Sequence, residues 1–302
     1  MRSGLLSTAE VSTMLKVNES TVKRWTDKGS LKCIKTPGGH RKYKMKDVVE
    51  FMDTFAYDVS ELLAPGKEQL SAITVSTDYA ILSKDYDALA EMLFNNVLEG
   101  NRENTFQFLS LLYANRIAQT DIFDRILFPA FFRIGAKWMN GEIGVEQEHL
   151  ASNTAMHAVM RLQEHVAKRP KHGGIALLGC LEEEYHEMGI TCVNAVLESN
   201  GWSTYYLGAN VPTESFVDAV EHYMPDLICV SSLTPRSKRW LVEQCGALRE
   251  TALLIGAKLV VGGAAASDAL RKKVPADLVP SNIAELNEYA ASLPRKNAPA
   301  RA

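Results

Sequence analysis

From residue 173 onward, the sequence alternates short apolar runs with stretches of amphipathic helical pattern. The apolar runs are IALLGC at 175–180, TYYLGA at 204–209, LICVSS at 227–232 and KLVVGG at 258–263, with a weaker run, ADLVP, at 276–280. Helical patterns at about 187–200, 213–224, 236–254 and 281–293 fill the intervals. Short, continuously apolar strands separated by helices are typical of a parallel sheet covered by helices on both faces. We therefore predict an α/β domain over residues 171–293.

The chain is long enough, at 302 residues, for two or three domains. Between Thr77 and Arg169 apolar residues recur at i, i+3 and i+4 spacing, which predicts a four-helix bundle over residues 77–170. A small domain of short helices and a basic strand is expected at residues 1–55. Residues 56–76, with a break at Pro65-Gly66, are predicted to be a linker, and residues 294–302 a loose tail.

Charge is distributed unevenly along the chain. Residues 1–52 carry eleven Lys and Arg against five Asp and Glu, a net charge of +6, so the overall −3 leaves −9 for the remainder. A basic N-terminal domain on an acidic body indicates an anionic partner for that domain alone. The sequence has neither a membrane-spanning apolar run nor a signal-peptide pattern, and its five cysteines form no C-x-x-C pair. We expect a cytoplasmic protein without a membrane partner.

Two short helices are predicted at the start of the basic domain. Thr8, or Ser7 before it, caps the first, and the second runs from Asn18 to Trp25 as NESTVKRW. Val22 and Trp25 are expected to face the small core. The outward residues of such a helix-turn-helix read the major groove of DNA, and here they are Thr21, Lys23 and Arg24.

A basic hairpin is predicted just downstream. The segment TPGGHRKYK at 36–44 places Pro-Gly-Gly at a tight turn, followed by His40, Arg41, Lys42 and Tyr43, which are expected to press against the DNA backbone. The alternative is a docking domain whose basic residues are only solvated. Together, STVKRW and TPGGHRKY resemble the MerR-type winged helix. That resemblance implies operator DNA as a partner, bound by dimers or larger homo-oligomers.

A histidine motif follows the first predicted strand, in EYHEMG at 184–189. By itself, this E-x-H-x-x-G motif is equally consistent with an ordinary histidine in a surface loop. However, 41 residues separate Gly189 from Ser231, which opens the S-x-L motif with Leu233, and 28 more separate Leu233 from Gly262-Gly263. Each element lies at a strand end, where α/β folds bind ligands, and small residues there would leave a slot for a bulky ligand.

This spacing resembles the cobalamin-binding module of methionine synthase and methylmalonyl-CoA mutase. The resemblance implies a flavodoxin-like fold that binds cobalamin with its nucleotide base displaced and the nucleotide tail buried beside Ser231, Leu233, Gly262 and Gly263. It also implies that His186 is the lower cobalt ligand. Glu184 stands where Asp is usual, and it can still accept the second imidazole N–H.

The predicted bundle carries a second pattern, in which Trp138 is followed by nine residues and then by Glu148-His149. By itself this pattern fits a core tryptophan and a helix start. Where it occurs together with a corrinoid module, this pattern resembles the one found in the CarH/LitR family of light-responsive repressors. The chain also shares the domain order of that family. The resemblance implies that Trp138, Glu148 and His149 line the adenosyl pocket of adenosylcobalamin. It also implies a dimer or tetramer that represses photoprotective or carotenoid genes in the dark and releases DNA when light breaks the cobalt–carbon bond.

One residue departs from that family pattern. Met139 stands where the family has a histidine that ligates cobalt after illumination. We expect water to take this position, with His149 as the other candidate, because a thioether is a weak donor for oxidised cobalt. Other hypotheses remain open. They are a regulator that responds to cobalamin without light, in the methylcobalamin or apo form, and a corrinoid module that serves a methyltransferase.

Overall fold

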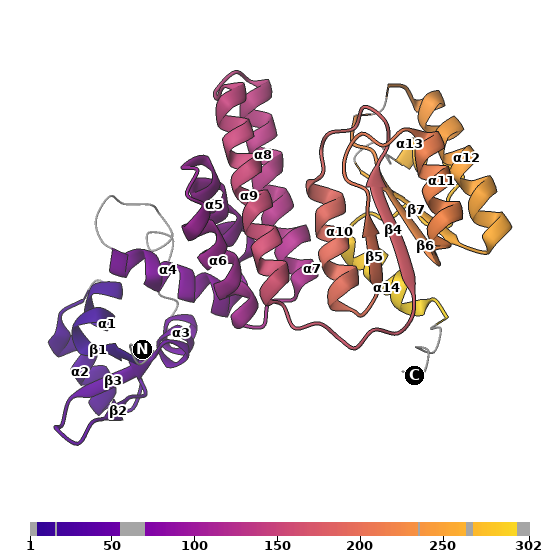
Figure 1. Cartoon of the computed structure of the whole chain (residues 1–302). Coiled ribbons are helices and arrows are strands. Elements are labelled where there is room, and N and C mark those ends of the chain that lie inside the picture. Colours follow the sequence, from indigo (N-terminus) through magenta and orange to yellow (C-terminus); the bar gives the residue numbers. More distant parts are fainter. Residues whose placement is uncertain (1–4, 16, 55–69, 235, 264–267, 295–302) are drawn as a thin grey trace. The chain divides into compact units, whose positions relative to one another are not determined.

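The N-terminal unit, Met1–Met92, joins a helix-turn-helix to a small antiparallel sheet (Figure 1). Over the whole chain, the computed structural model describes residues 5–15, 17–54, 70–234, 236–263 and 268–294. The elements of this unit are β1 (Leu5–Ser7), α1 (Thr8–Met14), α2 (Glu19–Asp27), β2 (Ile34–Lys35), β3 (Arg41–Lys44), α3 (Met45–Thr54) and α4 (Leu70–Ser83). The strand order is β1-β3-β2.

The residues at the N-cap positions mark where helices α1 and α2 begin. Ser7 caps α1 with a reciprocal capping box, because its hydroxyl accepts from the Glu10 N–H and the Glu10 carboxylate accepts from the Ser7 N–H. Asn18 occupies the N-cap position of α2 without a capping hydrogen bond from its side chain, and the helix runs to Asp27, two residues beyond the predicted end. The buried core beneath them is formed by Val11, Met14, Leu15, Val22, Leu31, Tyr43, Val48, Phe51, Met52 and Tyr79.

The structure extends the prediction for this unit and corrects it at two points. Strand β1 was not predicted, because three residues are too few to show an alternating pattern. The predicted linker at 56–76 is too long, since α4 begins at Leu70. Residues 56–69 lie outside the described part of the chain. Tyr79 on α4 packs in the buried core of the helix-turn-helix, so this helix belongs to the N-terminal unit.

The second unit, Leu93–Ala302, begins with a helical bundle. Its helices are α5 (Tyr86–Leu98, which starts before the boundary), α6 (Arg102–Ala114), α7 (Gln119–Asp121), η1 (Ile122–Leu127), α8 (Phe128–Met139) and α9 (Val145–His165). The η1 segment is a π-helix that ends two residues before Pro129, which has no N–H to continue the regular hydrogen-bond ladder. The long helices α6 and α9 pack side by side, as Figure 1 shows.

A four-stranded parallel sheet follows the bundle. Its strands are β4 (Ile175–Cys180), β5 (Ser203–Tyr206), β6 (Leu227–Ser231) and β7 (Lys258–Gly262), in the order β5-β4-β6-β7. The helices are α10 (Met188–Ser199), α11 (Thr213–Tyr223), α12 (Lys238–Ile255), α13 (Asp268–Arg271) and α14 (Ile283–Ser292). Figure 1 shows α10 and α14 on one face of the sheet, and α11 and α12 on the other.

The four strong strand predictions and their helices are therefore confirmed. The weaker run at 276–280 forms only an isolated bridge between Val260 and Leu278. The strand order is that of the first four strands of a flavodoxin-like sheet, and its direction of winding reverses between β4 and β6.

Polar contacts fasten one end of the bundle to the sheet domain. The Asp124 carboxylate on η1 accepts from the backbone N–H groups of Ile283 and Ala284 at 2.9 Å each, at the start of α14. Glu198 on α10 accepts from Gln163 and Lys168 at 2.8 Å each and from Thr204 at 3.0 Å. Across the described ranges, no helix is both long and apolar enough to span a membrane.

Candidate functional site

The carboxyl ends of three neighbouring strands lie in register. Cys180 at the end of β4 pairs with Ser231 at the end of β6, and Ser231 pairs with Gly262 at the end of β7. The reversal of winding between β4 and β6 is where open α/β sheets form their ligand crevice. The ends of these strands and the segments that follow them carry the E-x-H-x-x-G, S-x-L and Gly-Gly motifs.

His186 lies on the loop after β4 and is oriented by Glu184. Its Nδ1 is 2.5 Å from Glu184 Oε1, and its backbone N–H donates to the same oxygen at 2.9 Å. The Glu184 side chain is 2% exposed, whereas the His186 side chain is 57% exposed. In the described part of the chain, no hydrogen bond occupies Nε2 of His186. An imidazole with one nitrogen held by a carboxylate and the other open is the usual arrangement of a metal-ligating histidine.

The second oxygen of Glu184 reaches the loop after β6. Oε2 accepts from the backbone N–H groups of Leu233 at 2.6 Å and Thr234 at 2.7 Å, and the Thr234 hydroxyl lies at 3.3 Å. Burial raises the pKa of this carboxyl, but the donors from Thr234, His186 and Leu233 together outweigh it, so the pKa is lowered overall. Glu184 is therefore a buried carboxylate that stays ionised and fully engaged at neutral pH.

Small residues line the same crevice. A Cβ on Gly189 would lie 3.8 Å from the Ser231 hydroxyl, so these two motifs are in contact range. Gly263 has φ +107, and a Cβ there would lie 2.3 Å from the Ser232 carbonyl oxygen, so only glycine fits. Ser231 is buried, and the buried Ser232 hydroxyl has no hydrogen-bond partner among the described residues.

These observations fit the corrinoid group that the sequence suggested. The oriented imidazole provides a nitrogen donor for cobalt. Gly189 and Gly262 leave room at the strand ends, because the nearest atoms to a Cβ built on them lie 3.8 Å and 3.9 Å away. Leu233 is 37% exposed at the mouth of this crevice.

Trp138 and the Glu148-His149 pair lie on either side of the turn between α8 and α9. Trp138 is 48% exposed near the end of α8, and Glu148 and His149 are in the first turns of α9. Glu148 Oε2 lies 3.6 Å from His149 Nε2, and its Oε1 accepts from the Ser152 hydroxyl at 2.7 Å. Met139 is 75% exposed. Trp138 is thus not an ordinary core residue in this structure.

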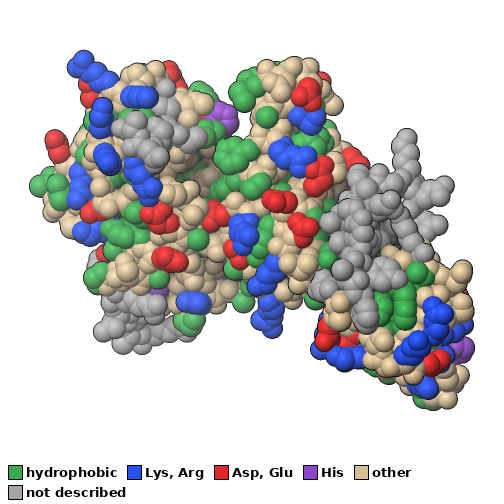
Figure 2. All heavy atoms as spheres, turned by 180° about the vertical axis from the view of Figure 1, so that it is seen from behind, with side chains coloured by type: hydrophobic (Ala, Val, Ile, Leu, Met, Phe, Trp, Pro, Cys, Tyr) green, Lys and Arg blue, Asp and Glu red, His purple; other side chains and the backbone are tan. Residues whose placement is uncertain are grey.

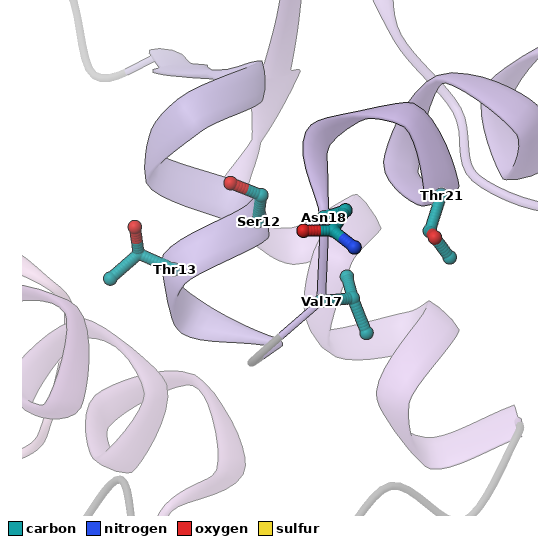
Figure 3. Close-up of a pocket in the computed structure, with 5 residues that line it drawn as sticks. All are labelled: Ser12, Thr13, Val17, Asn18 and Thr21. Atoms are coloured by element: carbon teal, nitrogen blue, oxygen red, sulfur yellow. The ribbon is translucent and has the colours of Figure 1, made fainter.

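The helix-turn-helix presents most of the predicted DNA-contacting residues. Lys23, Arg24 and His40 are exposed, and Thr21 lines a polar hollow of about 550 Å³ between α1 and α2 (Figure 3). The hollow is also lined by Ser12, Thr13, Val17 and Asn18. Figure 2 shows lysine and arginine side chains on the exposed face of this unit.

The hairpin at 36–44 is present, with Thr36 N–H donating to the His40 carbonyl across the turn. Arg41 is not fully free, because its Nη2 lies 2.6 Å from Asp27 Oδ1, and Lys42 is half-buried. The prediction for Tyr43 is wrong. Its side chain is fully buried and its hydroxyl lies 2.9 Å from the Thr26 hydroxyl, so it is a core residue and not a DNA contact. Strand alternation puts Tyr43 on the inner face of the hairpin.

Sequence reasoning missed the residues that fasten the His186 loop to its neighbours. They are Glu183, Asn210, Thr234 and Arg236. None belongs to a spaced motif, because the contacts join loops that are 27 to 53 residues apart in the sequence. The run of three glutamates at 182–184 was the one available signal.

Family models match three parts of the chain. A helix-turn-helix domain matches residues 5–55, and two B12 binding domains match residues 89–163 and 174–279. The chain thus combines a segment that matches a helix-turn-helix domain with two segments that match B12 binding domains.

Comparison with individual proteins shows more specific similarities. The chain is 36% identical over 146 residues to the HTH-type transcriptional repressor CarH of Myxococcus xanthus, a match covering 48% of this chain and 47% of the repressor. The chain is therefore similar to this repressor, and the match spans about half of the repressor's length.

Corrinoid proteins are similar to a larger part of this chain than the repressor is. Dimethylamine corrinoid protein 3 of Methanosarcina acetivorans is 23% identical over 67% of this chain and 94% of its own length. The structure of the Methanosarcina barkeri monomethylamine corrinoid protein superimposes with a TM-score of 0.57 at 25% identity, over 66% of this chain and 95% of that protein. The likeness supports the fold of the bundle and sheet.

Proposed function

We propose that the protein is an adenosylcobalamin-dependent transcriptional repressor with a MerR-type head, which binds operator DNA as a homo-oligomer in the dark and is released by light. The observation that carries the cobalamin part is the exposed His186 imidazole, fixed through Nδ1 by the buried Glu184 carboxylate at the switch point of the sheet. Similarity to the CarH repressor and the helix-turn-helix match support the regulatory part.

Each residue of the site has a role in this proposal. When bound, adenosylcobalamin would supply a light-sensitive cobalt–carbon bond. His186 would hold the cobalt from below, and Ser231, Leu233 and the Gly262-Gly263 pair would hold the nucleotide tail. Trp138, Glu148 and His149 would line the adenosyl pocket, whose contacts exist in the dark state only. Ligand contacts made in one state shift the population of assemblies toward that state.

DNA binding would depend on the number of heads in the assembly. A single unit of this size buries little DNA surface, so several heads are needed for firm binding. Thr21, Lys23 and Arg24 would read the groove, and His40, Arg41 and Lys42 would contact phosphates. We propose control of carotenoid or other photoprotective genes, as the family resemblance implies.

Two other functions are compatible with parts of the data. The likeness to corrinoid proteins over two thirds of the chain favours a methyl-carrying module, but the helix-turn-helix at 5–55 favours a regulator over an enzyme component. A regulator that senses methylcobalamin or cobalamin level without light shares every residue of the site.

A DNA-binding assay with different cofactors separates these functions. The full-length protein is incubated with a random duplex pool as apoprotein, with methylcobalamin and with adenosylcobalamin, in the dark and after green light, and bound DNA is quantified and sequenced. Our proposal predicts an enriched sequence with dark adenosylcobalamin and its release after light. Binding that is equal in the light and the dark contradicts photoreception. Absence of any enriched sequence contradicts the repressor function.

A further inference from the structure

The His186 loop is tied to the loop after β6 by one shared carboxylate. Glu184 Oε1 faces the His186 imidazole, and Oε2 accepts from the N–H groups of Leu233 and Thr234. The glutamate is long enough to serve both loops. An aspartate, shorter by one methylene, would have to give up one of the two sets of contacts.

A second fastening joins the same two loops next to the first. The Arg236 guanidinium donates to the Glu183 carboxylate through two nitrogens, Nε to Oε2 and Nη2 to Oε1, at 2.5 Å each. This is the bidentate geometry that gives an Arg–carboxylate pair its directional strength. The guanidinium also lies 5.5 Å from the ring centroid of Trp240 at the start of α12. Arg236 is therefore anchored to the helix at one side and to the His186 loop at the other.

A third contact holds the loop from the side of β5. Glu183 and Asn210 both have positive φ, +64 and +53. The Glu183 N–H donates to Asn210 Oδ1 at 2.8 Å, and the Asn210 N–H donates to the Glu184 carbonyl oxygen at 2.9 Å. A non-glycine residue in the left-handed region is unfavourable unless its surroundings hold it there. Residues 183 and 184 are thus clamped from two neighbouring loops.

These contacts have a consequence for ligand binding. A ligand that must order a flexible loop loses affinity, and a loop that is already ordered binds without that cost. We propose that Arg236, with Asn210 and Thr234, is a positioning residue that holds His186 in its cobalt-binding place before cobalamin arrives. The proposal rests on the cobalamin function proposed above and names residues that act through Glu183 and Glu184 rather than by touching the cofactor.

The test compares Arg236→Ala, Arg236→Lys and the charge swap Glu183→Arg/Arg236→Glu in the full-length protein. Arg239→Ala is the matched control, because Arg239 forms an exposed ion pair with Glu243 on the same helix. Adenosylcobalamin and hydroxocobalamin are titrated by absorbance. Histidine ligation at saturation is read from the electron paramagnetic resonance spectrum of the reduced, cob(II)alamin form in protein labelled with 15N-histidine, where the splitting changes from a triplet to a doublet only if a protein imidazole ligates cobalt. Circular dichroism confirms that each variant is folded.

Arg236→Ala is expected to weaken binding of both cobalamins about three- to tenfold while His186 still ligates cobalt at saturation. The swap and Arg236→Lys are each expected to recover part of the affinity, the swap only part because Arg236 also lies 3.6 Å from Glu182, which would repel a carboxylate at that position. Arg239→Ala is expected to bind like wild type. Asn210→Gly keeps the positive φ but removes the acceptor, so it is a second test that is expected to weaken binding similarly. Unchanged affinity in both Arg236→Ala and Asn210→Gly overturns this inference, as does an equal loss in Arg239→Ala. Failure of the wild type to bind either cobalamin instead overturns the proposed function.

Discussion

At the scale of single residues, the candidate site depends on one imidazole and the carboxylate that orients it. The spacing of the E-x-H-x-x-G, S-x-L and Gly-Gly motifs was enough to predict that His186, Ser231 and Gly262 belong to one site. The structure places the latter two in register at neighbouring strand ends. The sequence also suggested that Glu184 faces the imidazole, and the two groups are 2.5 Å apart. Their role toward cobalt is a prediction that mutation tests.

His186→Ala is expected to weaken adenosylcobalamin binding at least about tenfold and to change the spectrum of any bound cofactor, because the nitrogen donor is lost. The measurement is an absorbance titration of the purified protein. His222→Ala, an exposed histidine on α11 of the same domain, is the control and is expected to bind like wild type. Unchanged affinity and spectrum in His186→Ala would falsify the assignment.

Arg24→Ala and Arg41→Ala are expected to weaken DNA binding in different ways. A base contact by Arg24 is worth roughly 1–3 kcal/mol of sequence discrimination, so its loss relaxes sequence preference. Arg41→Ala is expected to weaken binding to all DNA sequences alike and to make the binding affinity less dependent on salt concentration. Because Asp27 neutralises Arg41, Asp27→Ala should strengthen binding, which separates a phosphate contact from a structural ion pair. Gel shifts in which neither arginine variant loses affinity contradict the DNA-reading assignment.

At the scale of elements, hydrophobic periodicity located the long helices and strands, but it did not locate features made by tertiary contact. The buried strands β4, β6 and β7 are continuous apolar runs that the sequence shows directly. Strand β1 and the inward Tyr43 depend on pairing with other segments, so local patterns did not show them. The clamp around residues 183 and 184 likewise joins loops far apart in sequence.

The junction between bundle and sheet is expected to weaken in acid through Glu198. Burial raises the pKa of this carboxyl, but donors from Lys168, Gln163 and Thr204 lower it overall. Its folded pKa therefore lies below its unfolded value near 4.5, so its stabilisation is present above that value and is lost as pH falls through the folded pKa. Glu198→Gln should cost about 1 kcal/mol at pH 7.

Unfolding midpoints of wild type and Glu198→Gln, measured from pH 7 to pH 3, should converge toward the acid end. The control Glu243→Gln removes an exposed ion pair on α12 and is expected to change stability little at any pH. A difference that stays constant or grows in acid contradicts the assigned direction.

At the scale of the whole molecule, Trp138, Glu148 and His149 are expected to link the crevice in the sheet domain to the assembly of protomers. Trp138 is half-exposed at the end of α8, so the indole is available to a ligand. Trp138→Ala is expected to retain cobalamin, because His186 and the crevice are intact, and to lose the light-dependent change in mass. Phe132→Ala, another exposed aromatic on α8, is the control. A Trp138→Ala protein that changes mass with light as wild type does would show that the indole is not part of the switch.

Light-controlled assembly through bound adenosylcobalamin is tested by following one sample through illumination. The full-length protein is loaded with adenosylcobalamin in the dark, and its absorption spectrum and its mass by light scattering are recorded before and after green light. We predict a bound cobalamin spectrum and an oligomer in the dark, and a changed spectrum with a smaller species after light. A spectrum that changes while the mass stays constant, or a protein that takes up no adenosylcobalamin, would contradict the account.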